Sequence, residues 1–243
     1  MPTIVPRRPV AKDRFAVLFP TLKAQTYHDP ASRGPGSHTC VADLARATGS
    51  ADRTLRIWNP EKPQVKNSTE LRGHTGPIER VAWNPTKEAE LASVSSDGTC
   101  KFWDVKTKKC TATVALGGDG LTIAWAADGS VVIVGRKDDH LIPITTLPTP
   151  TAGTPYHQGM QTNQATFNHT CPPTHLLLTS GDGSISILSY PSMNHLHTLH
   201  AHTSSCVSLA LSPTARYLAI GGTDALISLY DTTDWVWAAG GQL

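Results

Sequence analysis

The sequence predicts an all-β fold built from repeated four-stranded antiparallel units, and three observations support this. Aspartates recur at intervals of 45, 41, 44 and 42 residues, at Asp52, Asp97, Asp138, Asp182 and Asp224. The sixth residue after each of them is large and apolar: Trp58, Trp103, Ile144, Leu188 and Tyr230. In the copy with the fullest pattern, SSDGTCKFWD, this residue is followed by Asp. A period in the low forties with a Trp-Asp ending is typical of a β-propeller blade.

The copy at residues 71–116 predicts the order of strands within one unit. Residues 78–83 alternate between two faces, with Val81 and Trp83 on the same side. Pro85 begins a turn, because proline fixes φ and disfavours helix before it. The Asp97-Gly98 pair indicates a tight hairpin, since such turns need residues that tolerate positive φ. The strands are therefore expected at 78–83, 91–95, 99–105 and 110–116.

The other copies follow the same plan with less regular sequences. Strands are expected at 121–125, 130–134 and 141–144 in the third copy, at 176–180 and 184–188 in the fourth, and at 207–211, 217–220 and 226–230 in the fifth. Residues 148–160, rich in Pro, Thr and Gly, are expected to form an extended loop. In the first copy, residues 30–47 lack the pattern of a first strand, so we expect none there. The repeats predict no amphipathic helix.

Composition and charge divide the chain into three segments. Residues 1–28 form a basic, Pro-punctuated tail, residues 29–237 hold the propeller blades, and residues 238–243 form a short C-terminal tail. The basic residues of the first segment are Arg7, Arg8, Lys12, Arg14 and Lys23. Over the whole chain, 21 Lys and Arg face 19 Asp and Glu, so no global field favours nucleic acid or a membrane surface.

Cysteine usage and hydropathy argue against several classes of site. The five cysteines form no Cys-x-x-Cys pair, so they indicate neither a zinc site nor a disulfide framework. No apolar run approaches the roughly 20 residues of a membrane span. The histidine-rich stretch at 195–202 is interpreted as a polar outer strand rather than a metal site. We therefore expect no metal, no cofactor, no membrane partner and no small-molecule substrate.

The second copy carries a set of polar residues that resembles the WD-repeat signature. This resemblance implies a hydrogen-bonded chain within the blade, formed by His74, Ser93, Asp97 and Trp103. The physical reason is general, because a buried carboxylate and a buried Trp N–H both need partners. The first copy keeps part of the set, namely Thr48, Asp52 and Trp58. The fifth also keeps part of it, with Ile220 where a hydroxyl is expected: His202, Asp224 and Tyr230.

These residues are interpreted as structural rather than catalytic. A Ser/His/Asp catalytic set needs an exposed nucleophile, whereas this arrangement holds its members in a turn. The sequence contains no phosphate-binding Gly loop, no His-Glu-x-x-His and no Gly-x-Ser-x-Gly motif. We therefore expect no catalytic residue and no enzymatic activity.

The second half of the chain resembles the WD-repeat subunits of THO complexes, nuclear assemblies that couple transcription to mRNA packaging and export. The most specific phrases lie within GDGSISILSYPSMNHLHTLHAHTSSC and ARYLAIGGTDALISLYD, and GHTGPIERVAWNP fits in order and spacing. The resemblance covers roughly residues 43–236. It implies a non-catalytic scaffold subunit in the nucleus, which docks among other protein subunits and contacts mRNA indirectly.

Two alternative functions stay open. A different WD-repeat adaptor, such as a chromatin-binding protein or a ubiquitin-ligase substrate receptor, would share the fold and differ only at its surface. Direct RNA binding through the basic tail and the turn at Lys106, Lys108 and Lys109 would show as retention on RNA that weakens steeply with salt.

The resemblance also implies a seven-bladed ring, of which about five blades are recognisable. At the observed spacing, seven blades need on the order of 300 residues, more than the 243 of this chain. A propeller hides the edges and faces of its blades by closing the ring. We therefore expect an incomplete ring and a truncated chain.

Overall fold

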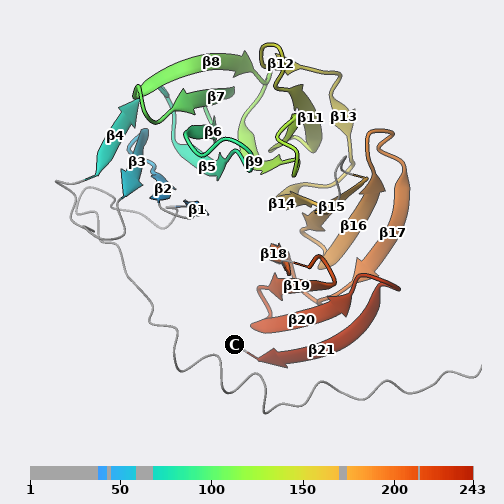
Figure 1. The fold of residues 1–243 in the computed structure, drawn as a ribbon. Coiled ribbons are helices and arrows are strands. Elements are labelled where there is room, and N and C mark those ends of the chain that lie inside the picture. The colour runs from blue at the N-terminus through green and yellow to red at the C-terminus, as the bar shows by residue number, and fades with distance from the viewer. Residues whose placement is uncertain (1–37, 43–44, 59–67, 170–173, 213, 243) are drawn as a thin grey trace, which may run out of the picture.

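Five antiparallel sheets, one for each repeat, lie side by side in an arc (Figure 1). The computed structural model describes residues 38–42, 45–58, 68–169, 174–212 and 214–242. The predicted basic tail at 1–28 lies outside these residues. The described part of the chain contains strands and no helix, so the all-β class is confirmed and no described helix could span a bilayer.

The first blade consists of β1 (His38–Ala42), β2 (Ala45–Gly49), β3 (Thr54–Trp58) and β4 (Thr69–Arg72). The second consists of β5 (Ile78–Trp83), β6 (Glu90–Ser95), β7 (Thr99–Asp104) and β8 (Lys109–Ala115). The third consists of β9 (Gly120–Trp125), β10 (Val131–Arg136), β11 (His140–Thr145), β12 (Thr151–Ala152) and β13 (Tyr156–His157). The fourth consists of β14 (Thr162–Phe167), β15 (His175–Ser180), β16 (Ser184–Ser189) and β17 (His195–His200). The fifth consists of β18 (Cys206–Leu211), β19 (Tyr217–Gly222), β20 (Leu226–Asp231) and β21 (Val236–Gln242).

The strands of the second blade confirm the sequence prediction closely. β5 has the predicted bounds, and β6, β7 and β8 each differ from theirs by one residue at one or both ends. The innermost strands β1, β5, β9, β14 and β18 lie around the central opening (Figure 1). Because successive strands of a blade are antiparallel, the loop that enters the blade and the hairpin between its second and third strands lie at the same end of the sheet.

The first blade has four strands, so the expectation that it lacks a first strand is wrong. β1 pairs with β2 in an antiparallel register that runs from His38↔Gly49 to Ala42↔Ala45. The sequence of β1 shows no clear alternation of apolar and polar residues. β1 is therefore stabilised by its backbone pairing with β2, because the preference of a segment for a strand depends strongly on its neighbouring strand.

The segment 148–160 is not a plain loop, because it contains the two short strands β12 and β13. β12 pairs with Ile144 and Thr145, whereas β13 pairs with His140 and Leu141. Between these pairs, β11 carries Pro143, which has no N–H to donate. The Pro143 carbonyl accepts a hydrogen bond from the Gly153 N–H at 2.7 Å, so it points toward the outer edge of the sheet. The outer strand of this blade is therefore divided in two at the proline.

The fifth blade extends beyond its predicted end. The residues expected to form a C-terminal tail from 238 onward belong instead, as far as Gln242, to strand β21. β21 pairs with β20 along its whole length, from Asp231↔Val236 to Leu226↔Gln242. The sequence did not predict this strand, because it contains glycines, which have a low intrinsic preference for strands. Backbone pairing to β20 again decides the outcome.

Successive blades pack against one another through the faces of their sheets. We call the side that contacts the following blade the forward face, and the side that contacts the preceding blade the rear face. Between the second and third blades, the forward-face residues Val94, Cys100 and Phe102 share one hydrophobic cluster with the rear-face residues Val132 and Val134. Equivalent clusters join the first blade to the second, the third to the fourth and the fourth to the fifth.

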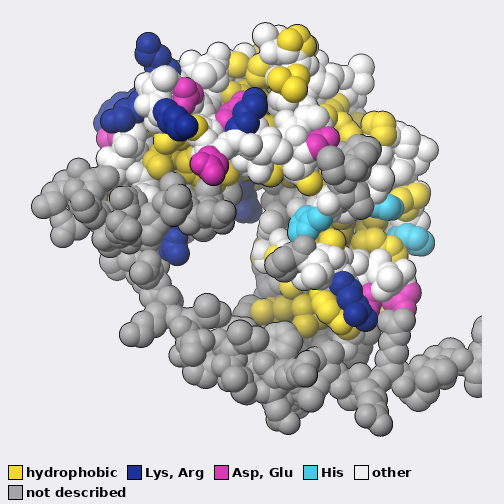
Figure 2. Space-filling model, viewed as in Figure 1, with side chains coloured by type: hydrophobic (Ala, Val, Ile, Leu, Met, Phe, Trp, Pro, Cys, Tyr) yellow, Lys and Arg dark blue, Asp and Glu magenta, His cyan; other side chains and the backbone are white. Residues whose placement is uncertain are grey.

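The arc is open between the fifth blade and the first (Figure 1). Hydrophobic clusters join four successive pairs of blades, and within the described ranges no such cluster joins the fifth blade to the first. The space-filling view shows an opening at the centre of the arc (Figure 2). The predicted incomplete ring is therefore confirmed for the part of the chain that the structure describes.

Candidate functional site

The five repeated aspartates all lie in the hairpin between the second and third strands of their blades. The residue after each Asp adopts a left-handed conformation, with φ of 69° at Arg53, 74° at Gly98, 64° at Asp139, 88° at Gly183 and 60° at Ala225. Tight hairpins need such a residue to reverse the chain without splaying the strands. The regular spacing of the aspartates thus reflects one turn geometry used five times.

In three of these hairpins the Asp side chain caps the start of the third strand. One carboxylate oxygen accepts hydrogen bonds from both the backbone N–H and the hydroxyl of the residue two positions later. The distances are 2.9 and 2.6 Å for Asp52 with Thr54, 3.0 and 2.6 Å for Asp97 with Thr99, and 2.9 and 2.6 Å for Asp182 with Ser184. Because these bonds join residues only two positions apart, they stabilise the turn locally.

The other two hairpins differ. Asp138 forms an ion pair with Arg136 instead of capping the residue two positions later. From the residue two positions later, Asp224 accepts only a backbone N–H, that of Leu226 at 3.2 Å, because leucine offers no hydroxyl. In both hairpins the residue two positions after the Asp has no hydroxyl, since it is His140 in the third blade and Leu226 in the fifth.

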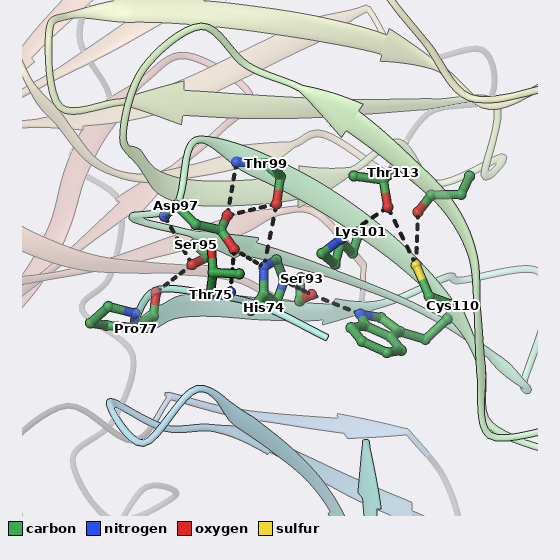
Figure 3. Close-up of polar contacts among 12 residues, drawn as sticks. His74, Thr75, Pro77, Ser93, Ser95, Asp97, Thr99, Lys101, Cys110 and Thr113 are labelled. Atoms are coloured by element: carbon green, nitrogen blue, oxygen red, sulfur yellow. Dashed lines mark hydrogen bonds and ion pairs between the residues drawn. The ribbon is translucent and has the colours of Figure 1, made fainter. Parts of the chain in front are cut away.

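In the second blade, the four predicted residues form one hydrogen-bonded chain, of which Figure 3 labels His74, Ser93 and Asp97. The Trp103 indole N–H donates to Ser93 Oγ at 2.8 Å, and Ser93 Oγ lies 2.7 Å from His74 Nε2. On the other side of the ring, His74 Nδ1 donates to Asp97 Oδ2 at 2.9 Å. Because the carboxylate can only accept, Nδ1 carries the proton and Nε2 accepts from the Ser93 hydroxyl. The chain thus ties the third strand, the second strand, the incoming loop and the hairpin together.

Burial and hydrogen bonding set the charge state of this chain. The side chain of His74 is 0% exposed and that of Asp97 is 6% exposed. Burial lowers the pKa of His74 although the adjacent Asp97 acts to raise it, so the neutral ring is favoured. Burial alone would raise the pKa of Asp97, but hydrogen bonds from Thr99, the Thr75 N–H and His74 outweigh it and lower that pKa. Asp97 is therefore ionised, and both of its carboxylate oxygens accept hydrogen bonds.

The first and fifth blades hold only parts of the chain. In the first, the Trp58 indole N–H donates to Thr48 Oγ1 at 2.8 Å, as predicted from their positions. In the fifth, His202 Nδ1 lies 3.0 Å from Asp224, but its Nε2 lies 3.2 Å from the Ile220 carbonyl oxygen. The Tyr230 hydroxyl donates elsewhere, to the His200 carbonyl at 3.5 Å. The chain in the fifth blade therefore stops at the histidine.

This geometry offers structure rather than reactivity. Ser93 is 0% exposed, so no substrate can reach its hydroxyl. Burial, together with the charges of Asp224 and Asp182, raises the pKa of the Cys206 thiol to about 11, which keeps it protonated. Among the described side chains, no three His, Cys, Asp or Glu are grouped closely enough to hold a metal ion. The histidines of β17 lie on an outer strand, where His195 contacts Thr198 at 2.7 Å.

Polar side chains on the inner strands bind the blades to one another, and none of these contacts was predicted. The Gln164 amide on β14 donates to the Leu209 carbonyl at 3.0 Å and accepts from the Leu209 N–H at 3.1 Å. The Trp125 indole N–H donates to the Ala82 carbonyl at 3.1 Å. Because the partners are backbone groups of a different repeat, no motif or spacing in the sequence identifies them.

Comparison with known proteins connects this geometry to a family. The family described as WD domain, G-beta repeat matches residues 35–59, 65–104 and 193–231. These ranges contain the blade turns at Asp52, Asp97 and Asp224, the ones in which the polar chain is complete or partly kept. The chain is a WD-repeat protein. Its sequence match and its five antiparallel blades agree on this.

This WD-repeat protein is similar to curated proteins over most of its length. It is 37% identical to THO complex subunit 3 of Arabidopsis thaliana over 193 residues, which cover 77% of this chain and 59% of that relative. It is 32% identical to WD repeat-containing protein AAC3 of Dictyostelium discoideum over 212 residues, covering 77% of this chain and 44% of the relative. A ribosome biogenesis protein WDR12 homolog of Dictyostelium discoideum is 40% identical over 63 residues, which cover 25% of this chain and 14% of that protein. The resemblance to the WD-repeat subunits of THO complexes is thus confirmed, and the chain spans roughly half of the length of the first two relatives.

Proposed function

We propose that this WD-repeat protein is a non-catalytic docking subunit of a nuclear THO-like complex, which couples transcription to mRNA processing and export. The observation that carries the proposal is the 37% identity to THO complex subunit 3 over 77% of the chain. Its partners are the other protein subunits of that complex, and it meets mRNA through them.

The architecture of the blades supports a docking role. The most strongly hydrogen-bonded polar side chains are locked inside the blades, where they hold hairpins and incoming loops in fixed positions. Loops on a rigid scaffold are the usual binding surfaces of repeat proteins. A blade array of this kind offers several such loops to large partners at once.

The test is affinity purification of the tagged chain from nuclear extract of its own host, with identification of the recovered proteins by mass spectrometry. We expect THO subunits to be recovered, and to be recovered equally after nuclease treatment. Recovery of chromatin or ubiquitin-ligase components without THO subunits would overturn the proposal in favour of a different WD-repeat adaptor.

A second arm addresses direct RNA binding, which the exposed basic turn between β7 and β8 favours. Lys106 and Lys108 in this turn, and Lys109 at the start of β8, are all exposed. Reversal of the three charges to Glu should leave recovery of THO subunits unchanged if these partners are proteins. Loss of recovery in this variant, together with sensitivity to nuclease and a steep decrease with salt, would support direct RNA binding instead.

A further inference from the structure

The stretch between Asp139 and Arg216 is almost free of charged side chains. It contains no Lys, Arg or Glu, and its one Asp is the repeated Asp182, although 16% of the residues in the whole chain are charged. The stretch includes all of the fourth blade and the outer strands of the third. Soluble surfaces normally carry many charges, whereas the centres of protein–protein interfaces are depleted of them. The composition of this stretch is therefore typical of a surface that another protein covers.

Large apolar side chains are exposed along the same stretch. Leu147 is 67% exposed, Met160 is 45% exposed and Leu196 is 41% exposed. Within the described residues of the first two blades, no large apolar side chain is exposed to this degree. On the side of the molecule where Figure 1 places β17, Figure 2 shows histidine beside hydrophobic side chains. The lack of charge and the exposed apolar residues thus coincide.

β17 adds a free hydrogen-bonding edge to these two features. It is the outermost strand of the fourth blade, paired on one edge with β16, and no described strand pairs with its other edge. Its six residues, HLHTLH, include no Lys, Arg, Asp or Glu, and all except Leu199 are exposed. Proteins usually protect such edges with charged side chains, because a free edge can take up a further strand. β17 lacks this protection.

The outer strands of the first two blades carry the charges that β17 lacks. β4 contains Glu70 and Arg72, which form an ion pair with each other. β8 begins with the exposed Lys109, which directly follows the exposed Lys108 of the basic turn. Because a charged side chain opposes the addition of another strand, these two edges are protected and that of β17 is not.

The bulge residue of β17 also differs from its counterpart in β8. A register shift in each strand leaves one residue without a partner in the ladder, Leu196 in β17 and Thr111 at the same place in β8. The Thr111 hydroxyl donates to the Phe102 carbonyl of its own blade at 3.2 Å. Leu196 has no polar group and leaves its apolar side chain in solvent. Leu196 is thus available to a partner, whereas Thr111 bonds within its blade.

We propose that β17 is a docking edge, to which an extended segment of a partner protein adds as a fifth strand of the fourth blade. Backbone hydrogen bonds hold the segment in place, and one of its apolar side chains covers Leu196. The side chains of the segment that face β17 are uncharged, because β17 offers no charge to pair with and burial of an unpaired charge is costly. This inference rests on the proposed docking function, since it says where the partner binds.

The chemistry of the edge favours this occupant over a nucleic acid or a helix. A nucleic acid needs Lys or Arg to neutralise its phosphates, and residues 140–215 contain neither. A helix keeps its own backbone groups paired, so a helix laid on β17 would remove water from the free N–H and C=O groups without replacing those hydrogen bonds. Six residues in a strand extend over about 20 Å, which is enough to pair with one short segment.

Site-specific photo-crosslinking tests the proposal with the whole chain in nuclear extract of its host. A photoreactive phenylalanine analogue replaces Leu196, and in the matched control it replaces Thr111, the bulge residue of β8. We expect the analogue at 196 to cross-link one THO subunit, identified by mass spectrometry, and the analogue at 111 to cross-link none. Leu196→Lys should lower recovery of that subunit more than about fivefold by placing a charge in the covered edge, whereas Thr111→Lys should leave recovery unchanged.

Amide hydrogen exchange tests whether the segment adds as a strand. In the recovered complex, the outward N–H groups of residues 195–199 should exchange at least about tenfold more slowly than in the free chain, because they become hydrogen-bonded. The amides of β8 are the internal control and should exchange equally in both. Unchanged exchange in β17 would contradict strand addition.

The outcomes separate this inference from the proposed function. Recovery of THO subunits without a cross-link at 196, or undiminished recovery by Leu196→Lys, would overturn the docking edge and leave the proposed function intact. A cross-link at 196 to an identified protein outside THO complexes, lost in Leu196→Lys, would support the docking edge and contradict the THO assignment. A cross-link to RNA or to a second copy of the chain would overturn the docking edge.

A second variant guards against misfolding. Thermal unfolding checks that each variant is folded. If Leu196→Lys does not fold, Thr198→Lys places the same charge at another exposed position of β17. Undiminished recovery of the partner by that variant would equally contradict the proposal.

Discussion

The second and fifth blades share one strand plan but differ in how completely they are stabilised. In the second, both sheet faces are covered and the chain from Trp103 to Asp97 is unbroken. In the fifth, the described residues cover only the rear face, and the polar chain stops at His202. The fifth blade forms the same hairpin around its Asp although its polar chain is incomplete. The hairpin therefore requires neither the complete polar chain nor a covered forward face. The predictions below test these two features one at a time.

The largest difference between the blades should come from the forward faces. Phe102 is 0% exposed and its ring contacts Trp125 of the next blade edge-on, with 5.9 Å between the ring centres. Phe102→Ala should lower the free energy of unfolding by about 3–5 kcal/mol. Leu229→Ala, at the matching position of the fifth blade, should cost about 1 kcal/mol, because that side chain is only half-buried. Urea denaturation measures the free energy of unfolding of both variants. Equal losses would contradict the inference that the forward face of the fifth blade is less buried than that of the second.

The next effect should come from the capping aspartates. Asp97→Ala removes the acceptor for His74, the Thr75 N–H and Thr99, and should cost about 1–3 kcal/mol because it leaves buried donors without partners. Asp224→Ala should lower the unfolding midpoint less, since Asp224 has fewer partners. Hydrogen exchange should locate the loss of protection in the second or fifth blade respectively. An unchanged second blade in Asp97→Ala would refute the assigned role of the polar chain.

A smaller effect, and one of opposite sign, is expected from adding a hydroxyl at Leu226, two positions after Asp224 in the fifth blade. Leu226→Thr places a hydroxyl where Thr99 caps Asp97 in the second blade, so Asp224 should gain one further hydrogen bond besides those from His202 and the backbone N–H. Thermal unfolding should show a rise in the midpoint of about 1–2 °C. Leu226→Val is the control, because it has the same branched shape without the hydroxyl and should show no such gain.

The smallest effect is expected from mild acidification. The pKa of His74 is lowered in the fold, so the unfolded chain binds more protons and stability present above the ordinary value near 6.5 is lost as pH falls below it. The lowered pKa of Asp97 adds a further loss below its ordinary value of 3.8. Unfolding midpoints at pH 7.5, 6.5 and 5.5 measure the first of these losses. His74→Gln should reduce the dependence over this range, and an unaltered dependence would contradict a neutral, buried His74.

The sequence predicted the parts of the fold that rest on local chemistry. The hairpins at the five aspartates were predictable because each depends on residues within two positions of the Asp. The link from Thr48 to Trp58 and the set from His74 to Trp103 were predictable because their positions follow the repeat. By contrast, β1 and β21 were missed, since their pairing depends on the backbone of an adjacent strand more than on their own side chains.

The sequence by itself determined that this protein repeats one four-stranded unit, where each turn falls, and which blade carries the complete polar chain. Those features arise from short-range hydrogen bonds and from alternation along single strands. Only the tertiary structure decided that Gln164 reaches the backbone of Leu209 and that Ile227 is 36% exposed whereas Ile185, at the matching position, is 0% exposed. Burial of an apolar side chain depends on what lies opposite its sheet, and that is a property of the arrangement of blades rather than of any one repeat.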